Sequence, residues 1–282
     1  MKKIILLFTI TVFFFTNTSA QQSSDDGILK VLAIGNSFSD DAVEHFLYDI
    51  AKAGNKKIII GNMYIGGAPI VLHVKNATAD KKAYSYRKIN LDGEKNVTKN
   101  VSLAEAIGNE NWDYISLQQA SSFSGQYDVI MKDLPKLISY VQSLAPNAKL
   151  IYHQTWAYQQ DSKHKGFANY NKDQTTMYKS IMDVTKRIDK SKAFAFIVPA
   201  GTSIQNARTS SIGDHFTRDG FHLQLTYGRF TVACAWYEKL FNEDVRQNPC
   251  QPEKISALEA KIAKEAAHKA VKKPFKVSKI KL

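Results

Sequence analysis

Two short stretches of this sequence together hold the residue types that can hydrolyse an ester. Ser37 lies in AIGNSFSDD, residues 33–41, whereas Asp219 and His222 lie three apart in DGFHL near the other end of the chain. A serine hydroxyl becomes an effective nucleophile when a neighbouring imidazole takes its proton. The imidazole needs a group on its second ring nitrogen, which fixes its tautomer and stabilises its charged form. We therefore predict a triad of Ser37, His222 and Asp219.

Acyl transfer also requires fixed hydrogen-bond donors for the oxygen of the tetrahedral intermediate. Gly66 and Gly67 follow one predicted strand, and Gln118 and Gln119 follow another. We expect the backbone amides of Ser37 and of Gly66 or Gly67 to form this oxyanion hole, together with one side-chain amide. Gln118 is the first choice for that side chain, and Gln119 is the second.

Three further residues are candidates for contact with a substrate. Asn36 precedes Ser37, His73 follows the glycine pair in PIVLHVKN, and Trp156 follows a strand in HQTWAY. His73 could instead cover the base of a hairpin, and Trp156 could simply pack in the core. His153, on the apolar strand before Trp156, is interpreted as a core histidine.

The apolar pattern of the chain predicts a scaffold that brings these residues together. Short apolar runs typical of buried strands lie within residues 28–35, 56–67, 112–119, 148–157 and 193–201. Because helical patterns alternate with these strands, we expect a mostly parallel five-stranded sheet between two layers of helices, a flavodoxin-like α/β/α sandwich. Active sites of such sheets form at the carboxyl ends of the strands, where the candidate residues fall.

The predicted helices follow the strands along the chain. One begins with Asp40 or Asp41 as its N-cap and runs to about Ala53. The others cover residues 128–144, with a kink or restart near Pro135, and residues 173–190, 225–241 and 254–271. Residues 84–103 break the alternation, because two polar strand-like runs flank Asp92-Gly93, which predicts an inserted β-hairpin.

These blocks resemble the SGNH or GDSL hydrolase superfamily, whose members are α/β/α esterases and lipases, many of them acting on acetylated carbohydrates. GNSFSD, the glycine pair and DGFHL occur in the family's order. The resemblance implies Ser37 as nucleophile, Gly66 or Gly67 as oxyanion glycine, and Asp219 and His222 as the rest of the triad.

Two positions depart from the family pattern. Asn36 stands where the family usually has an aspartate, a position that supports the turn. LQQASS, residues 117–122, stands where the family usually has G-x-N-D with an asparagine as oxyanion donor. The segment is more similar to the glutamine-containing block of the sialic acid esterase branch.

The ends of the chain differ from its body in composition. Lys2 and Lys3, the apolar residues 4–15 and the small residues 18–20 are typical of a secretory signal peptide. We therefore expect a periplasmic or secreted protein cleaved near Ala20, with an SGNH-like domain over residues 21–247, a basic tail over 248–282 that packs little, and no membrane span.

Charge and cysteines narrow the choice of partners. The net charge is +12, but eight lysines and one glutamate fall in residues 261–282, so the body is only mildly basic and no nucleic-acid partner is expected. Cys234 and Cys250 could form a disulfide, or Cys234 could be a buried thiol. Their spacing predicts no metal site.

Together these features predict an exported serine esterase that removes acyl groups, above all O-acetyl groups of carbohydrates, through an acyl-enzyme. No metal or cofactor is required, and the partner is a small-molecule or glycan ester. Two alternatives stay open: a lipase, lysophospholipase or thioesterase of the same fold, and a non-catalytic glycan-binding protein on a degenerate SGNH scaffold. The sequence does not indicate an oligomeric state.

Overall fold

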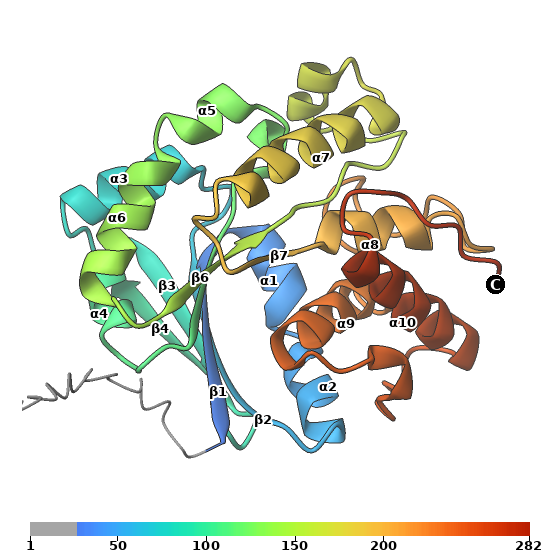
Figure 1. The fold of residues 1–282 in the computed structure, drawn as a ribbon, viewed down its shortest axis with the longest axis horizontal. Helices are drawn as coiled ribbons and strands as arrows, with labels where there is room; N and C mark the ends of the chain where they lie inside the picture. The colour runs from blue at the N-terminus through green and yellow to red at the C-terminus, as the bar shows by residue number, and fades with distance from the viewer. Residues whose placement is uncertain (1–26) are drawn as a thin grey trace, which may run out of the picture.

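A computed structural model of the chain describes residues 27–282 (Figure 1). The predicted signal peptide, residues 1–20, lies outside the described residues. Five parallel strands lie side by side in one sheet, in the order β2-β1-β5-β6-β7. Their bounds are β1 Ile28–Gly35, β2 Lys57–Tyr64, β5 Tyr114–Leu117, β6 Lys149–His153 and β7 Phe196–Val198. The predicted five-stranded parallel core is confirmed.

The predicted hairpin is also confirmed, and it extends the sheet. β3 (Tyr84–Ile89) pairs antiparallel with β2, and β4 (Lys95–Val101) pairs antiparallel with β3, so the described residues form one seven-stranded sheet. Gly93 has a φ of +89°, a conformation that glycine adopts without steric cost, which explains why the turn lies at Asp92-Gly93.

Helices cover both faces of the sheet, as the sandwich prediction requires (Figure 1). One layer holds α3 (Ile70–Thr78), α4 (Leu103–Ile107), α5 (Tyr127–Met131) and α6 (Leu134–Leu144). The other holds α1 (Ser37–Val43), α2 (Leu47–Ala53), α8 (Ala200–Ala207), α9 (Tyr227–Phe241) and α10 (Ala257–Lys272). A separate apolar core fills the space on each side of the sheet, and α7 (Gln174–Lys190) contributes side chains to both. Short 3₁₀ helices occur at Ser121–Phe123, Lys165–Tyr170 and Val245–Gln247.

Several helix boundaries differ from the predictions. The prediction that Asp40 or Asp41 caps the first helix is wrong, because Asn36 caps α1 by accepting a hydrogen bond from the Phe38 amide at 3.0 Å. The expected single helix to Ala53 is divided into α1 and α2. The restart near Pro135 is confirmed, since α5 ends at Met131 and α6 begins at Leu134.

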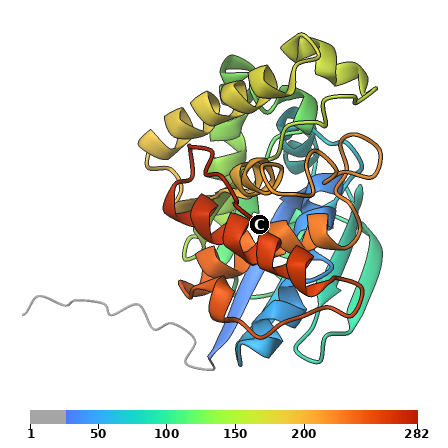
Figure 2. The same cartoon turned by 90° about the vertical axis from the view of Figure 1, so that its right-hand side faces the viewer.

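The prediction that the basic tail packs little is wrong. The expected helix is present as α10, but five of its six alanines are buried against the rest of the layer. Figure 2 shows α10 on the outer side of this layer. Small side chains let two helices approach closely, and the lysines of α10 lie on its other faces. The buried residues of α10 are Ala260, Ile262, Ala263, Ala266, Ala267 and Ala270.

Two further expectations from the sequence concern the two cysteines and membrane-spanning helices. Cys234 and Cys250 are both buried free thiols in this structure. No helix within residues 27–282 is both long and apolar enough to cross a membrane.

Candidate active site

Ser37 lies at the carboxyl end of the central strand β1, where the chain turns into α1. Gly35 allows this turn, because a Cβ at that position would lie 2.6 Å from the Ser39 hydroxyl and 2.9 Å from the Gln118 side chain. The turn places Ser37 as the first residue of α1, with its side chain half-buried at the edge of the sheet.

The structure brings the three predicted triad side chains together. His222 Nε2 lies 2.9 Å from Ser37 Oγ, although 185 residues separate the two in sequence. The other ring nitrogen, Nδ1, lies 2.6 Å from Oδ2 of Asp219. When Nδ1 carries the proton toward the carboxylate, Nε2 is free to accept the hydroxyl proton of Ser37.

Asp219 is held in place by its own turn. Its second oxygen, Oδ1, accepts hydrogen bonds from the amides of Phe221 at 3.2 Å and His222 at 2.8 Å. Partial burial alone would raise the pKa of Asp219, but the hydrogen bonds from the ring of His222 and from these amides lower it below its ordinary value. Asp219 is therefore ionised at neutral pH and can stabilise a charged imidazole.

Asn36 supports the turn rather than facing a substrate. Its side chain is 2% exposed. Oδ1 accepts from the amide of Phe38 and from Nε2 of Gln118 at 2.9 Å, and Nδ2 donates to the carbonyl of Ala68 at 3.0 Å. The structure therefore does not support the predicted substrate contact of Asn36, because its polar atoms are already bonded inside the protein.

The glycine pair is tied to the same turn at both ends. Before the pair, the Ile65 amide donates to the carbonyl of Gly35 at 3.4 Å. After it, the Ala68 carbonyl accepts from Asn36. Gly66 and Gly67 are exposed, and Gly67 has a φ of +66°. The loop is therefore held beside the start of α1.

The backbone amides in this region are available as donors. Within residues 27–282, the amides of Ser37, Gly66 and Gly67 have no hydrogen-bond acceptor. Unpaired backbone donors next to a nucleophile are what an oxyanion hole requires. The structure thus leaves the predicted backbone donors free.

The two glutamines have different surroundings. Gln118 is buried and donates from Nε2 to Asn36, so it supports the Ser37 turn. Gln119 accepts at Oε1 from the amides of Ile70 at 3.0 Å and Ala120 at 2.8 Å. In the part of the chain that the structure describes, Nε2 of Gln119 has no acceptor. The geometry therefore favours Gln119, the second choice from sequence, as the free side-chain donor.

The structure does not support the other two predicted substrate contacts either, because both residues are completely buried. His73 Nδ1 lies 2.9 Å from the hydroxyl of Tyr84, at the base of the hairpin, which matches the alternative interpretation of this residue. Trp156 stacks on Phe38 with ring centroids 4.1 Å apart and donates from Nε1 to the carbonyl of Phe221 at 2.7 Å. Trp156 therefore supports the residue that precedes His222.

Two residues close to the triad were not predicted from the sequence. The ring centroid of His164 lies 4.6 Å from that of Phe221, which in turn lies 4.1 Å from that of His222, and all three side chains are half-buried. Burial, followed by the proximity of His222, lowers the pKa of His164. Asp41, interpreted as a helix cap, is buried against the segment that carries His222. Its position four residues after Ser37, on one face of a helix, was the available signal.

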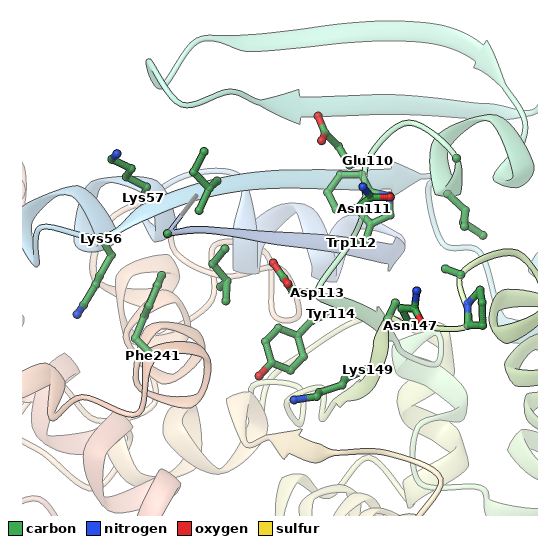
Figure 3. Close-up of a pocket in the computed structure, with 18 of the residues that line it drawn as sticks. Lys56, Lys57, Glu110, Asn111, Trp112, Asp113, Tyr114, Asn147, Lys149 and Phe241 are labelled. Carbon is green, nitrogen blue, oxygen red and sulfur yellow. The ribbon is translucent and has the colours of Figure 1, made fainter. Parts of the chain in front are cut away.

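A large cavity elsewhere in the molecule is separate from this site. A cavity of about 1250 Å³ lies at the opposite end of the sheet, and Figure 3 shows Lys56, Asp113, Asn147 and Lys149 among the residues around it. These residues lie at or before the amino ends of parallel strands, whereas ligands of open α/β sheets bind at the carboxyl ends. The triad is therefore the better candidate for chemistry.

Two clusters of acidic residues and histidines are compact enough to share a cation: Asp40 with Asp41 and His45, and Glu238 with Asp244 and His268. Each cluster is already paired with an arginine. Arg229 donates to Asp41 at 2.7 Å, and Arg246 lies 2.6 Å from Asp244. Because these guanidinium groups neutralise the carboxylates, neither cluster is assigned as a metal site.

A family model and several solved structures are similar to this chain. A family model described as "Domain of unknown function (DUF4886)" matches residues 30–270. The crystal structure of a DUF4886 family protein from Bacteroides uniformis is 47% identical, with a TM-score of 0.88, and the match covers 90% of this chain and 98% of that one. A protein from Slackia heliotrinireducens, described as a proposed SGNH hydrolase, matches at 16% identity and a TM-score of 0.52, over 75% of this chain and 98% of that one. No curated protein matches the sequence.

Proposed function

Because the chain belongs to the DUF4886 family and has the fold of the SGNH hydrolases, we propose that it is a serine esterase that removes O-acetyl groups from carbohydrates. The observation that carries the proposal is the continuous hydrogen-bond chain from Ser37 through His222 to Asp219, with separations of 2.9 and 2.6 Å. Fold alone does not establish an activity, and this chain of side chains is what the chemistry requires.

In the acylation step, Ser37 Oγ attacks the ester carbonyl carbon while His222 Nε2 takes the hydroxyl proton. The carbonyl oxygen becomes an oxyanion and accepts hydrogen bonds from the amides of Ser37 and of Gly66 or Gly67, and from Nε2 of Gln119. The intermediate then collapses. The bond to the alcohol oxygen breaks, and His222 gives its proton to the departing alcohol.

In the deacylation step, water attacks the carbonyl carbon of the acyl-enzyme while His222 again takes a proton. The bond to Ser37 Oγ breaks, and His222 returns the proton to that oxygen. The carboxylic acid leaves, and the starting enzyme is restored. Asp219 keeps its charge throughout and stabilises the imidazolium that forms in both steps.

A carbohydrate substrate is supported by the half-buried rings beside the triad. Phe221 and His164 lie next to His222, where the alcohol part of the ester would leave. Aromatic faces provide flat apolar surface against which the C–H groups of a sugar can pack. The predicted export of the protein to the periplasm or beyond is consistent with a glycan substrate.

The proposal is tested with the mature protein and a fluorophosphonate, which labels an activated serine covalently. We expect labelling of Ser37, hydrolysis of p-nitrophenyl acetate, and loss of both in Ser37→Ala, with turnover at least about 10⁴-fold lower. Ser139→Ala, at an exposed serine of α6, is the matched control and should behave like the wild type. Gln119→Ala should lower turnover about 10²–10³-fold.

The outcome also separates the alternatives. If the wild type is not labelled and hydrolyses no more ester than Ser37→Ala, the esterase proposal fails, and retained glycan binding would favour the non-catalytic alternative. If the wild type prefers long-chain esters to acetate and acetylated sugars, the lipase or thioesterase alternative replaces the carbohydrate substrate.

A further inference from the structure

Asp41 connects the helix of the nucleophile to the segment that carries His222. It lies four residues after Ser37, so both side chains leave the same side of α1. The carboxylate is fully buried, with 0% of its side chain exposed. Its Oδ2 accepts a hydrogen bond at 2.8 Å from the amide of Leu223, the residue directly after His222.

Two arginines complete the surroundings of this carboxylate. Arg218 Nη1 donates to Oδ1 at 3.0 Å and to Oδ2 at 3.3 Å, and Arg229 Nε donates to Oδ1 at 2.7 Å. Arg218 belongs to the same segment as His222, whereas Arg229 belongs to α9. A buried carboxylate is tolerated only when it is paired and hydrogen-bonded, as it is here.

These bonds hold residues 217–223, which we name the His222 loop. Contacts within the loop join its two sides. The amide of Arg218 donates to the carbonyl of His222 at 2.9 Å, and Thr217 forms an isolated bridge with Leu223. The side chain of Arg218 also donates to the carbonyl of Leu223. Hydrogen bonds therefore join the two sides of the loop to each other, and Asp41 is bonded to both sides.

We propose that Asp41 is a positioning residue for the triad. It acts through Leu223 and Arg218 rather than on a substrate, and it fixes His222 Nε2 at hydrogen-bond distance from Ser37 Oγ. Because Ser37 and Asp41 share one helix, the nucleophile and the anchor of its base move together. This inference rests on the proposed esterase function, since it assigns a role within that reaction.

Precise placement matters because a displacement of about 1 Å between reacting groups lowers a rate by about 10²-fold. Asp41→Asn keeps the size of the side chain but replaces one acceptor oxygen by an NH2 group. That NH2 group must then face the amide of Leu223 or the guanidinium group of an arginine, and all of these groups are hydrogen-bond donors. We therefore expect the His222 loop to shift away from Ser37 in a protein that is still folded.

The test measures the rate of Ser37 labelling by a fluorophosphonate, together with kcat and KM for p-nitrophenyl acetate and the thermal unfolding midpoint. For folded Asp41→Asn we expect labelling and kcat to fall about 10- to 100-fold with KM changed less than about 3-fold. The matched control is Asp40→Asn. Asp40 is the neighbouring acid of α1. It pairs with Arg87 at 2.9 Å and lies 3.9 Å from Arg229, but it makes no bond to the His222 loop, so this variant should label like the wild type.

A purely structural role would lower the unfolding midpoint without changing the labelling rate of the folded fraction. Folded Asp41→Asn that labels within 2-fold of the wild type therefore overturns the inference. If Asp41→Asn does not fold, Arg218→Gln decides instead, because Arg218 is 32% exposed and its loss leaves the buried carboxylate two other donors. We expect at least 3-fold slower labelling, and an unchanged rate would refute the inference. Failure of wild-type labelling would instead refute the proposed function itself.

Discussion

Lowering the pH from 7 to 5 should destabilise the fold through two buried histidines, His73 and His153. Burial lowers the pKa of His73 from 6.5 to about 4 and that of His153 from 6.5 to about 3. In each ring Nδ1 has a hydrogen-bond partner, Tyr84 for His73 and Trp236 for His153, whereas the buried Nε2 has none among the described residues. Both rings are therefore neutral in the folded protein.

The sign of the effect follows from proton uptake. The unfolded chain binds a proton at each of these histidines near pH 6.5, but the folded chain does so only near pH 4 and pH 3. Acid therefore favours the unfolded state below about pH 6.5. Integrated from pH 7 to pH 5, each ring lowers the free energy of unfolding by about 2 kcal/mol, so the pair contributes about 4 kcal/mol. That is a large part of the 5–15 kcal/mol of a typical domain.

Urea unfolding at pH 7 and pH 5 measures this difference. His73→Asn and His153→Asn each keep an acceptor close to the position of Nδ1 and remove the titrating group. Each should lose about half of the pH dependence, whatever it costs in stability at pH 7. His215→Asn is the matched control, because His215 is exposed and should leave the difference as it is in the wild type.

The result that would refute this reasoning is a wild type whose unfolding free energy changes by less than about 1 kcal/mol between the two pH values. The same holds if neither asparagine variant reduces the difference. Either result would mean that the two rings accept protons in the folded state, through water or through movement of their neighbours.

Three further substitutions test the turn, the glycine loop and the tail. Asn36→Asp places an acceptor oxygen where Nδ2 now donates to the carbonyl of Ala68 at 3.0 Å. The substitution should lower the free energy of unfolding, measured in urea, by about 2 kcal/mol or more. Equal stability would refute this role of the amide. Gly67→Ala should lower the free energy of unfolding by about 1–2 kcal/mol, because alanine is strained at a φ of +66°. No clash with a neighbour adds to this cost, since no atom lies within 4 Å of the added Cβ. Ala266→Lys should lower the free energy of unfolding by about 3 kcal/mol or more, because Ala266 is buried where α10 packs on its neighbours. A decrease of less than about 0.5 kcal/mol would mean that this face of α10 is exposed to solvent.

Prediction from sequence succeeded where the signal is local. The alternation of apolar strands with helical patterns predicted the parallel core, and Asp92-Gly93 predicted the hairpin, because backbone preference and apolar periodicity are properties of short segments. The helices α3, α4 and α8 were not predicted, because each has nine residues or fewer and so little helical periodicity to detect. The order of the blocks around Ser37, Gly66 and His222 also predicted which side chains would meet, since all follow strands that end at one edge.

Roles that depend on distant partners were not predicted. Asn36 was interpreted both as a support of the turn and as a substrate contact, and Asp41 as a helix cap, because the residue type alone does not distinguish these roles near the start of a helix. Only the folded chain places Ala68 and Leu223 against them. The preference for Gln119 over Gln118 likewise depends on which amide group already has an acceptor.

The sequence by itself determined the class of fold, the identity of the three side chains of the proposed triad and the position of the glycine loop, because each depends on residue type and spacing along one segment. Tertiary structure alone decided what supports them. Asp41 and Leu223 are 182 residues apart, and the alanine face of α10 is buried only because α8 and α9 lie beside it. Burial and hydrogen-bond partners are properties of the packed chain, and no local pattern carries them.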